Sequence, residues 1–266
     1  MAFLGKVVLI TGASSGIGAA TAIHLSHLGA SLSLTGRNLT NLEKIADQCN
    51  KERKPFLITG ELTNEDDTKK ILESTIKHFG KLDILINNAG TIERGGIENT
   101  SLDQYDRNID IFKDISSSSL FNLNVRSMYQ LTMLAVPHLI KTKGNIVNVS
   151  SVNGLRSFPG VLAYCMSKSA VDQFTRCTAI ELGSKQVRVN AVNPGVVITN
   201  LHERSGMSPE ELSAFFERSK TTHALGRPGQ ADEVAKTIAF LASDDASNIT
   251  GATLPVDGGR HALCPR

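Results

Sequence analysis

A chain of 266 residues is long enough for one large α/β domain with a substantial core. Its formal net charge of +2 and its 5% of aromatic residues favour neither nucleic acid nor an acidic surface as a partner. No apolar run approaches the roughly 18 residues of a membrane span, and no signal sequence is visible, so we expect no membrane span. The cysteines are scattered without metal-ligand spacing (Cys49, Cys165, Cys177 and Cys264). We therefore expect no metal site and no disulfide framework, and a cytoplasmic location.

The first element in the chain is a short apolar strand. Residues 7–10 are β-branched or leucine, which is typical of a strand buried on both faces of a parallel sheet. The strand leads into a glycine-rich loop at 11–18, which helical periodicity over 19–28 follows, and a second strand is expected at 32–34. Together these elements form a βαβ unit whose loop is placed to bind a dinucleotide.

The glycines of this loop each have an expected mechanical role. Gly12 allows the tight turn, whereas Gly16 and Gly18 let the backbone approach a pyrophosphate and let the helix pack on the strand. Free N–H groups at the helix N-terminus would face the phosphates. The alternative is a plain strand–helix turn without a ligand.

Arg37 follows the second strand, where dinucleotide folds that use NAD carry a carboxylate for the ribose hydroxyls. An arginine can pair with a 2′-phosphate, which a carboxylate would repel. This residue therefore favours NADP over NAD. The alternative is a surface arginine that begins the next helix.

The rest of the chain continues the alternation of strands and helices. Strands are expected at 55–59, 82–86, 146–149, 187–192 and 253–256, and helices at 41–51, 63–78, 124–139, 164–183 and 231–241. Thr63 and Asp66 would form a capping box at the start of one of these helices. The pattern predicts a single Rossmann-type α/β domain over 1–266, a doubly wound seven-stranded parallel sheet with helices on both faces. The polar segment at 197–225 is expected to be a flap over the site.

Tyr164 and Lys168 lie four residues apart, which on a helix places them on one face. A lysine ammonium close to a phenol stabilises the phenolate and so favours acid–base chemistry on a carbonyl or an alcohol. A serine from Ser150-Ser151 could hydrogen-bond the same substrate oxygen. A pair with this spacing also occurs by chance on solvated helix faces.

With these residues in view, the chain resembles the short-chain dehydrogenase/reductase family over essentially its whole length. The motifs that carry the resemblance are the loop at 11–18, Asn87-Asn88-Ala89-Gly90, Tyr164-x-x-x-Lys168, and Pro194-Gly195 with Thr199. The resemblance implies that Ser151, thirteen residues before Tyr164, is the catalytic serine.

The resemblance also implies a role for each site residue. Tyr164 would be the general acid or base, Lys168 would hold the nicotinamide ribose and favour the tyrosinate, and Asn124 would help to hold a proton-relay water. Glu61 and Leu62 would lie near the adenine. The cofactor set is Gly12, Ser14, Ser15, Gly16, Ile17, Gly18, Arg37, Glu61, Leu62, Asn88, Ala89, Gly90, Tyr164, Lys168, Pro194, Gly195, Val197 and Thr199.

The sequence departs from the family pattern in three places. Glu61 stands where aspartate is usual, and Ser15 stands where NADP-dependent members often have a basic residue, so Arg37 alone supports NADP. An atypical insertion at about 108–120 precedes Asn124, which leaves Asn108 and Asn122 as competitors for its role. The insertion could alter a dimer face or be a solvated surface loop.

The predicted function is an NADP(H)-dependent oxidoreductase that interconverts a carbonyl and an alcohol on a small apolar substrate such as a steroid, retinoid, terpenoid or xenobiotic. The flap contributes apolar residues to this prediction (Leu201, Met207, Phe215 and Phe216). One alternative is a 3-oxoacyl-thioester reductase, with Arg126 and Arg156 as candidates for binding an acyl carrier protein. The other is a non-catalytic dinucleotide-binding sensor or scaffold. The family resemblance implies a homodimer or homotetramer.

Overall fold

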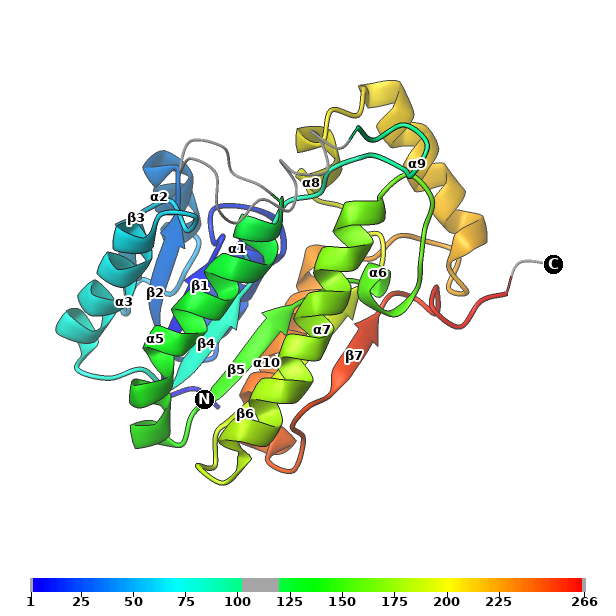
Figure 1. Ribbon diagram of the computed structural model, residues 1–266. Coiled ribbons are helices and arrows are strands. Elements are labelled where there is room, and N and C mark those ends of the chain that lie inside the picture. Colours follow the sequence, from blue (N-terminus) through cyan, green and yellow to red (C-terminus); the bar gives the residue numbers. More distant parts are fainter. Residues whose placement is uncertain (1, 102–119, 265–266) are drawn as a thin grey trace.

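The computed structural model describes residues 2–101 and 120–264, and its strands form one parallel sheet in the order β3-β2-β1-β4-β5-β6-β7 (Figure 1). The strands are β1 (Val7–Thr11), β2 (Ser31–Gly36), β3 (Phe56–Thr59), β4 (Ile84–Asn87), β5 (Asn145–Val149), β6 (Arg188–Pro194) and β7 (Thr253–Val256). The chain proceeds outward from β1 in one direction and then from β4 in the other. This order places a switch point between β1 and β4, where open α/β sheets bind ligands.

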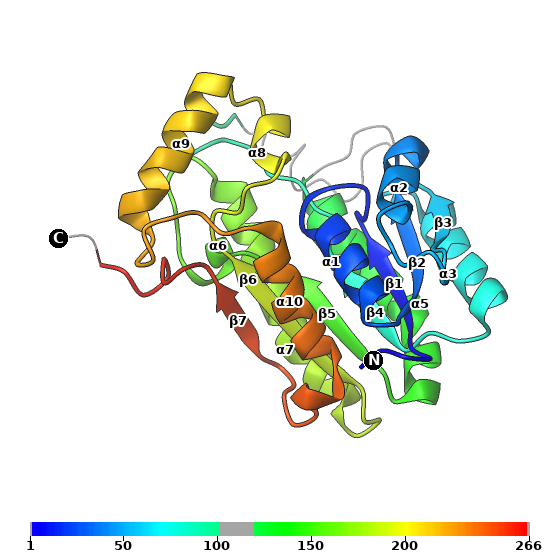
Figure 2. The ribbon, with the colours of Figure 1, turned by 180° about the vertical axis from the view of Figure 1, so that it is seen from behind.

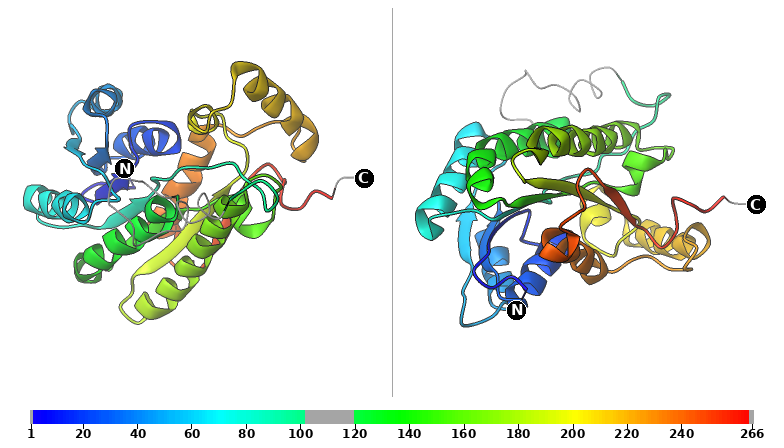
Figure 3. Two further views of the ribbon diagram at one scale, coloured as in Figure 1. Left: turned by 45° about the horizontal axis from the view of Figure 1, so that its top comes forward. Right: turned by 90° about the horizontal axis from the view of Figure 1, so that it is seen from below.

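Two layers of helices cover the sheet. One face carries α1 (Gly16–His27), α2 (Leu39–Ala46) and α10 (Ala231–Ala242), and the other carries α3 (Glu65–Phe79), α5 (Ser127–Thr142) and α7 (Leu162–Gly183), as Figures 1 and 2 show from opposite sides. The same two layers are visible in the further views of Figure 3. The structure therefore confirms the predicted doubly wound α/β fold.

The remaining helices are α6 (Val152–Leu155), α8 (Leu201–Arg204), α9 (Pro209–Thr222), the π-helical turn η1 (Asn122–Arg126) and the 3-10 helix η2 (Asp244–Ala246). Helices α8 and α9 belong to the segment expected to be a flap, and they lie beyond the carboxyl ends of the strands (Figure 1). None of the helices in the described part of the chain combines the length and the apolar character that a membrane span requires.

Strand β1 shows why the sheet needs both helical layers. All five of its residues are buried. Val8 and Ile10 pack with residues of α1 and α10, whereas Val7 and Leu9 pack on the other face with residues of α3, α5 and α7. Burying each such side chain contributes roughly 1.5–3 kcal/mol. The apolar run that predicted a doubly buried strand thus forms the centre of the domain.

The start of α3 differs from the prediction. Asn64, not Thr63, is the N-cap: its side-chain oxygen accepts a hydrogen bond from Asp67 N at 3.0 Å. The predicted capping box of Thr63 and Asp66 is therefore wrong by one residue, and the helix begins at Glu65. Asparagine caps a helix as well as threonine does, so two adjacent candidates competed in this sequence.

Two other element boundaries also differ. Helix α2 is shorter than the predicted range 41–51 and begins earlier, because the side chain of Asn38 accepts a hydrogen bond from Asn41 N at 2.9 Å and caps it. Strand β6 continues through Pro194, which pairs with Val256 of the edge strand β7. The expected insertion at 108–120, with the competitor Asn108, lies outside the described residues apart from Leu120.

Candidate active site

A cleft lies at the carboxyl ends of β1, β4, β5 and β6, across the switch point of the sheet. Nearly all of the predicted cofactor residues line it. They are Gly12, Ser14, Ser15, Gly16, Ile17, Arg37, Glu61, Leu62, Asn88, Ala89, Gly90, Tyr164, Lys168, Pro194, Gly195, Val197 and Thr199. The exception is Gly18, whose added Cβ would lie 2.4 Å from both Asn88 Nδ2 and Gly12 O. Gly18 therefore permits close packing behind the cleft and does not line it.

The loop after β1 is held in place by the end of β4. Thr11 Oγ1 accepts hydrogen bonds from the backbone N–H groups of Asn88 and Ala89, each at 3.0 Å. Asn88 Nδ2 donates to Thr11 O at 2.9 Å and to Gly12 O at 3.2 Å. Gly12 has φ of +63° and comes so close to Ala89 that a Cβ would lie 2.9 Å from Ala89 Cα. A side chain at this position would be strained and would also clash.

The N-terminus of α1 fits the phosphates of a dinucleotide. Its N-cap Ser15 makes no side-chain capping hydrogen bond, and the first turn contains no acidic residue. The first amide groups of the helix are thus left for an anion, and the helix dipole favours negative charge there. The residues present fit the pyrophosphate that the glycine loop predicts.

At the far end of the cleft, Arg37 and Glu61 lie side by side. Arg37 Nη1 is 3.5 Å from Glu61 Oε2, and the Arg37 side chain is 70% exposed. Such an exposed pair is weak. The guanidinium can therefore turn to an incoming phosphate without loss of a strong interaction.

Ser151, Tyr164 and Lys168 are brought together as the sequence predicted. Ser151 caps α6, and its hydroxyl oxygen accepts a hydrogen bond from Asn153 N at 3.1 Å. Lys168 Nζ donates to Val149 O at 2.9 Å and lies 5.7 Å from the centre of the Tyr164 ring. Ser151 is 6% exposed, Tyr164 6% and Lys168 4%. All three thus come to one buried point at the end of β5.

Burial sets the protonation of this group. It raises the pKa of Tyr164 to about 12, which hydrogen bonding by Ser151 only partly offsets. It lowers the pKa of Lys168 to about 8 against the opposing charge of Asp172. The expectation that Lys168 lowers the pKa of Tyr164 is therefore not met in this structure, because burial of the phenol outweighs a lysine that is bonded elsewhere. The phenol is protonated at neutral pH, as a proton donor must be.

Asn124 lies in the π-helical turn η1 and is fully buried. Its Nδ2 donates to Thr91 O at 2.9 Å and to Ser167 Oγ at 3.1 Å, and its Oδ1 accepts from Thr91 N at 2.9 Å. A Cβ on Gly90 would lie 3.2 Å from Asn124 Oδ1 and 3.6 Å from Lys168 Nζ. Asn124 and Lys168 thus both lie beside Gly90, although Asn124 does not line the cleft.

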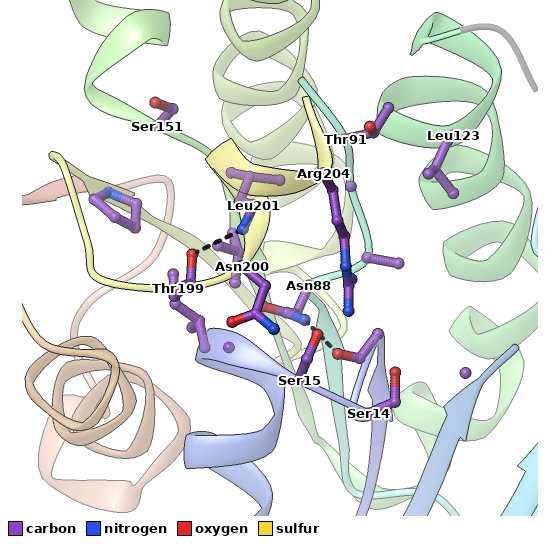
Figure 4. Close-up of a pocket in the computed structure, with 18 of the residues that line it drawn as sticks. Ser14, Ser15, Asn88, Thr91, Leu123, Ser151, Thr199, Asn200, Leu201 and Arg204 are labelled. Atoms are coloured by element: carbon purple, nitrogen blue, oxygen red, sulfur yellow. Dashed lines mark hydrogen bonds between the residues drawn. The ribbon is translucent and has the colours of Figure 1, made fainter. Parts of the chain in front are cut away.

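Some residues that line the cleft were not singled out from the sequence. They are Gly36, Gly60, Thr91, Leu123, Val149, Ser150, Asn200, Leu201, His202 and Arg204. Arg204 extends from α8 into the cleft toward Asn88, and Thr199 Oγ1 accepts from Leu201 N at 3.4 Å (Figure 4). The available signal for Arg204 was its position as a basic residue in the segment expected to be a flap over the site.

A second cavity of about 650 Å³ adjoins the cleft. Ser151, Tyr164, Gly195, Leu201 and His202 line both spaces. The apolar residues of the second cavity include Phe158, Val161, Leu201, Met207 and Phe215. Of the flap residues predicted to meet the substrate, Phe216 does not line this cavity. A molecule in this cavity would meet Ser151 and Tyr164 at the end of the cleft.

Comparison with known proteins shows the family. A family model described as enoyl-(acyl carrier protein) reductase matches residues 12–261. The meso-2,3-butanediol dehydrogenase of Serratia marcescens is 37% identical over 262 residues, 98% of this chain and 97% of that protein. The 3-oxoacyl-(acyl-carrier-protein) reductase of Thermotoga maritima is 35% identical over 259 residues, 96% of this chain and 97% of that protein.

A solved structure also shows similarity to this family. The short-chain dehydrogenase/reductase of unknown function from Caenorhabditis elegans, solved with its cofactor, has a TM-score of 0.87 and 33% identity and covers 99% of this chain and 98% of that one. The chain belongs to the short-chain dehydrogenase/reductase family. It is an oxidoreductase of carbonyl or alcohol groups that uses a nicotinamide dinucleotide.

Proposed function

We propose that the protein is an NADP(H)-dependent oxidoreductase that interconverts a carbonyl and an alcohol on a small substrate with an apolar body. The position of Ser151 and Tyr164 carries this proposal. Both residues line the dinucleotide cleft and also the adjoining cavity with its apolar walls. A substrate in the second cavity would therefore meet the cofactor and the proton donor at the same point.

The proton chemistry follows from the state of the buried phenol. When bound, the cofactor supplies hydride to the carbonyl carbon from C4 of its nicotinamide, or accepts hydride in the oxidative direction. Tyr164 gives its phenolic proton to the carbonyl oxygen in reduction and takes a proton from the alcohol in oxidation. Ser151 donates a hydrogen bond to the same oxygen and stabilises the charge that develops there.

Lys168 and Asn124 would assist the proton transfer by Tyr164 without contacting the substrate oxygen. The Lys168 ammonium would bind the ribose hydroxyls of the nicotinamide half and, with the cofactor in place, favour the tyrosinate. Asn124 joins the segment after β4 to α7 through Thr91 and Ser167, so it holds the backbone around Lys168. Asn124 would help to hold a proton-relay water near Lys168.

The preference for NADP rests on Arg37. No carboxylate follows β2 directly, and the exposed guanidinium of Arg37 can reach a 2′-phosphate at the ribose end of the cleft. Glu61 would contact the adenine in place of the usual aspartate. Arg204 would add a second cation over the phosphates.

A 3-oxoacyl-thioester reductase remains the second candidate, and one observation favours it: Arg156 lines the cavity. The other candidate for carrier recognition, Arg126, is not suited to the role. It forms an ion pair with Glu65 at the start of α3 and lines neither space. Turnover of a carrier-linked substrate against its free ketone would separate the two functions.

We also propose that the protein forms a homodimer through the outer faces of α5 and α7. Tyr129 is 57% exposed, Met133 53% and Ile180 83%. Helices α5 and α7, which carry these residues, lie in one layer on the same face of the sheet (Figure 1). Contact with a second copy would remove their apolar surface from water.

A screen of cofactor oxidation tests the proposed function. NADPH and NADH are offered with a panel of ketones, aldehydes and quinones, and we expect turnover with NADPH at a kcat/KM at least tenfold above that with NADH. A strong preference for NADH would overturn the reading of Arg37. Tight NADPH binding without turnover of any compound would favour the non-catalytic sensor.

A further inference from the structure

The cavity beside Ser151 and Tyr164 is strongly positive. Four arginines line it: Arg94, Arg156, Arg218 and Arg260. Among the described residues, no aspartate or glutamate lines it. An apolar substrate alone gives no reason for such a concentration of charge, because bringing cations together in a partly buried space costs free energy.

Two of these arginines already have partners. Arg94 Nη1 lies 3.6 Å from Glu211 Oε1. Arg156 Nη1 donates to His261 O, which joins the end of α6 to the segment after β7. These contacts shape the wall of the cavity and use part of the hydrogen-bonding capacity of both side chains.

Arg260 is different because its buried Nε has no hydrogen-bond partner among the residues that the structure describes. Its guanidinium lies 4.5 Å from the centre of the Phe158 ring. The nearby carboxylate of Asp257 is engaged elsewhere: it accepts from Gly259 N at 3.0 Å and lies 2.9 Å from His261 Nδ1. A buried donor without a partner is destabilising unless a ligand satisfies it.

Arg218 also lines this cavity, from an exposed position on α9. It has no salt bridge among the described residues, and its charge acts with burial to lower the pKa of Arg260. The same positive field reaches His202, where burial and the charges of Arg94 and Arg260 lower the pKa to about 4. Arg218 and Arg260 thus place two like charges on the wall of one cavity, and no aspartate or glutamate lines it among the described residues.

We propose that the substrate carries an oxyanion, a carboxylate or a phosphate, in addition to its carbonyl or alcohol group, and that Arg218 and Arg260 bind this anion. The planar guanidinium group with its fixed donors matches a carboxylate or a phosphate in a bidentate manner. The apolar walls formed by Phe158, Met207 and Phe215 would hold the part of the molecule between the anion and the carbonyl. This inference rests on the proposed function, since it takes Ser151 and Tyr164 as the site of reaction.

Paired substrates test the proposal directly. The kcat/KM for 4-oxopentanoate is compared with that for its methyl ester, and the kcat/KM for dihydroxyacetone phosphate with that for dihydroxyacetone. We expect the anionic member of at least one pair to be favoured tenfold or more, and the favoured pair identifies the carboxylate or the phosphate as the source. Equal or better turnover of both neutral members would overturn the proposal.

Substitution of Arg218 and Arg260 tests whether these two residues cause the preference for the anionic substrate. In the double variant R218Q/R260Q the ratio of kcat/KM for the anionic member of the favoured pair to kcat/KM for its neutral member should fall toward one. The matched control K141Q/K185Q removes the same charge from two exposed lysines beyond the opposite end of the sheet, and should keep the ratio of the wild type. A double variant that keeps the wild-type ratio would contradict the assignment to Arg218 and Arg260. Turnover of carrier-linked substrates alone would contradict a small anionic substrate.

A binding measurement separates failure of this inference from failure of the proposed function. Succinate and inorganic phosphate are titrated calorimetrically into the wild type, R218Q/R260Q and K141Q/K185Q. We expect at least one of the two anions to bind the wild type and the lysine control alike, and to bind R218Q/R260Q at least tenfold more weakly. This result without any turnover would contradict the oxidoreductase function and leave the anion site standing. Absence of binding by both anions would overturn the site.

Discussion

At the scale of single residues, burial in the candidate active site raises the pKa of one group, Tyr164, and lowers the pKa of another, Lys168. The pKa of Tyr164 rises to about 12 and that of Lys168 falls to about 8, because each uncharged form is favoured away from water. The spacing of Tyr164 and Lys168 could be predicted from the sequence, since a separation of four residues places them on one helix face. The sequence did not predict that burial would have the larger effect on their pKa values, because burial depends on which elements cover the two side chains.

Lys168 makes the stability of the protein depend on pH. Its pKa is about 8 in the fold and 10.5 in a model peptide, so between these values the unfolded state binds more protons than the native state. The free energy of unfolding should therefore rise with pH from about 8 to about 10.5, and this part of the slope vanishes outside that window. Near pH 10 the phenol of Tyr164 begins to ionise in the unfolded state but not in the fold, where its pKa is about 12, so it slightly lowers the free energy of unfolding there.

Urea unfolding at pH 7.5 and at pH 10 checks this expectation, with Lys168→Met as the comparison. The wild type should gain on the order of 2 kcal/mol more than the variant over this interval. The variant has no charge to bury, so its remaining slope comes from other groups. Parallel pH profiles for the two proteins would show that Lys168 is not held at a lowered pKa.

At the scale of elements, the site is fixed by the corner where α6, α7 and β6 meet. Asn193 Nδ2 of β6 donates to Ser151 O at 2.8 Å and to both carboxylate oxygens of Asp172, each at 3.0 Å. Asp172 is 1% exposed and lies on α7 one turn after Lys168. This network connects Ser151 to α7, which explains why a carboxyl group is retained in the interior.

This corner was not visible in the sequence. Motif spacing predicts which residues share one helix face, but it does not predict that Asn193 joins Ser151 to Asp172, since that contact spans three elements. The π-helical turn around Asn124 was also unpredicted, because an α-helix and a π-turn have the same apolar composition. Such a turn is often found at functional sites.

Gly154 of α6 tests the packing of the corner. A Cβ at this position would lie 2.3 Å from Asp172 Oδ2 and 2.8 Å from Lys168 O. We expect Gly154→Ala to lower the free energy of unfolding by about 1–3 kcal/mol and to lower kcat as well, because α6 would have to move away from α7.

Gly183→Ala at the end of α7 is the matched control. An added Cβ there meets no atom within 4 Å, so the change should be neutral or stabilise the helix by about 0.5–1 kcal/mol. Chemical denaturation and steady-state kinetics measure both variants. If Gly154→Ala behaved like Gly183→Ala, the close contact between α6 and α7 would not hold Ser151 and Lys168 in place.

At the scale of the whole molecule, the fold class and the order of strands and helices could be predicted, because buried parallel strands read as continuous apolar runs. Strand β7 matches its predicted range 253–256, and α7 begins only two residues before the predicted 164. The boundaries at α2 and α3 differ because Asn38 and Asn64, two short polar residues, cap the helices by contacts that spacing alone does not rank. The positive charge of the second cavity arises from arginines that are distant in the sequence, so it could not be predicted from the sequence.

The exposed apolar face of α5 and α7 predicts the state of assembly. Sedimentation velocity should give the mass of a dimer or a tetramer for the wild type, whereas the double variant Met133→Glu with Ile180→Glu should sediment as a smaller species. Two carboxylates at this face would have to be buried without partners on association. Leu4→Glu, which alters an apolar side chain that is 59% exposed elsewhere, should leave the mass unchanged. A wild type that sediments as a monomer at micromolar concentration would rule out this interface.

The role of Tyr164 as proton donor is tested most directly by Tyr164→Phe, which removes one hydroxyl and keeps the ring that fills the site. With a ketone found in the NADPH screen, we expect kcat to fall by roughly 10²–10⁴-fold, the usual contribution of general acid–base catalysis. The Kd for NADPH, measured by fluorescence titration of the same preparation, should stay within about threefold of the wild-type value, because the glycine loop and Arg37 are untouched. A variant that binds NADPH normally and turns over at a near-normal rate would contradict the assignment of Tyr164 as the catalytic acid.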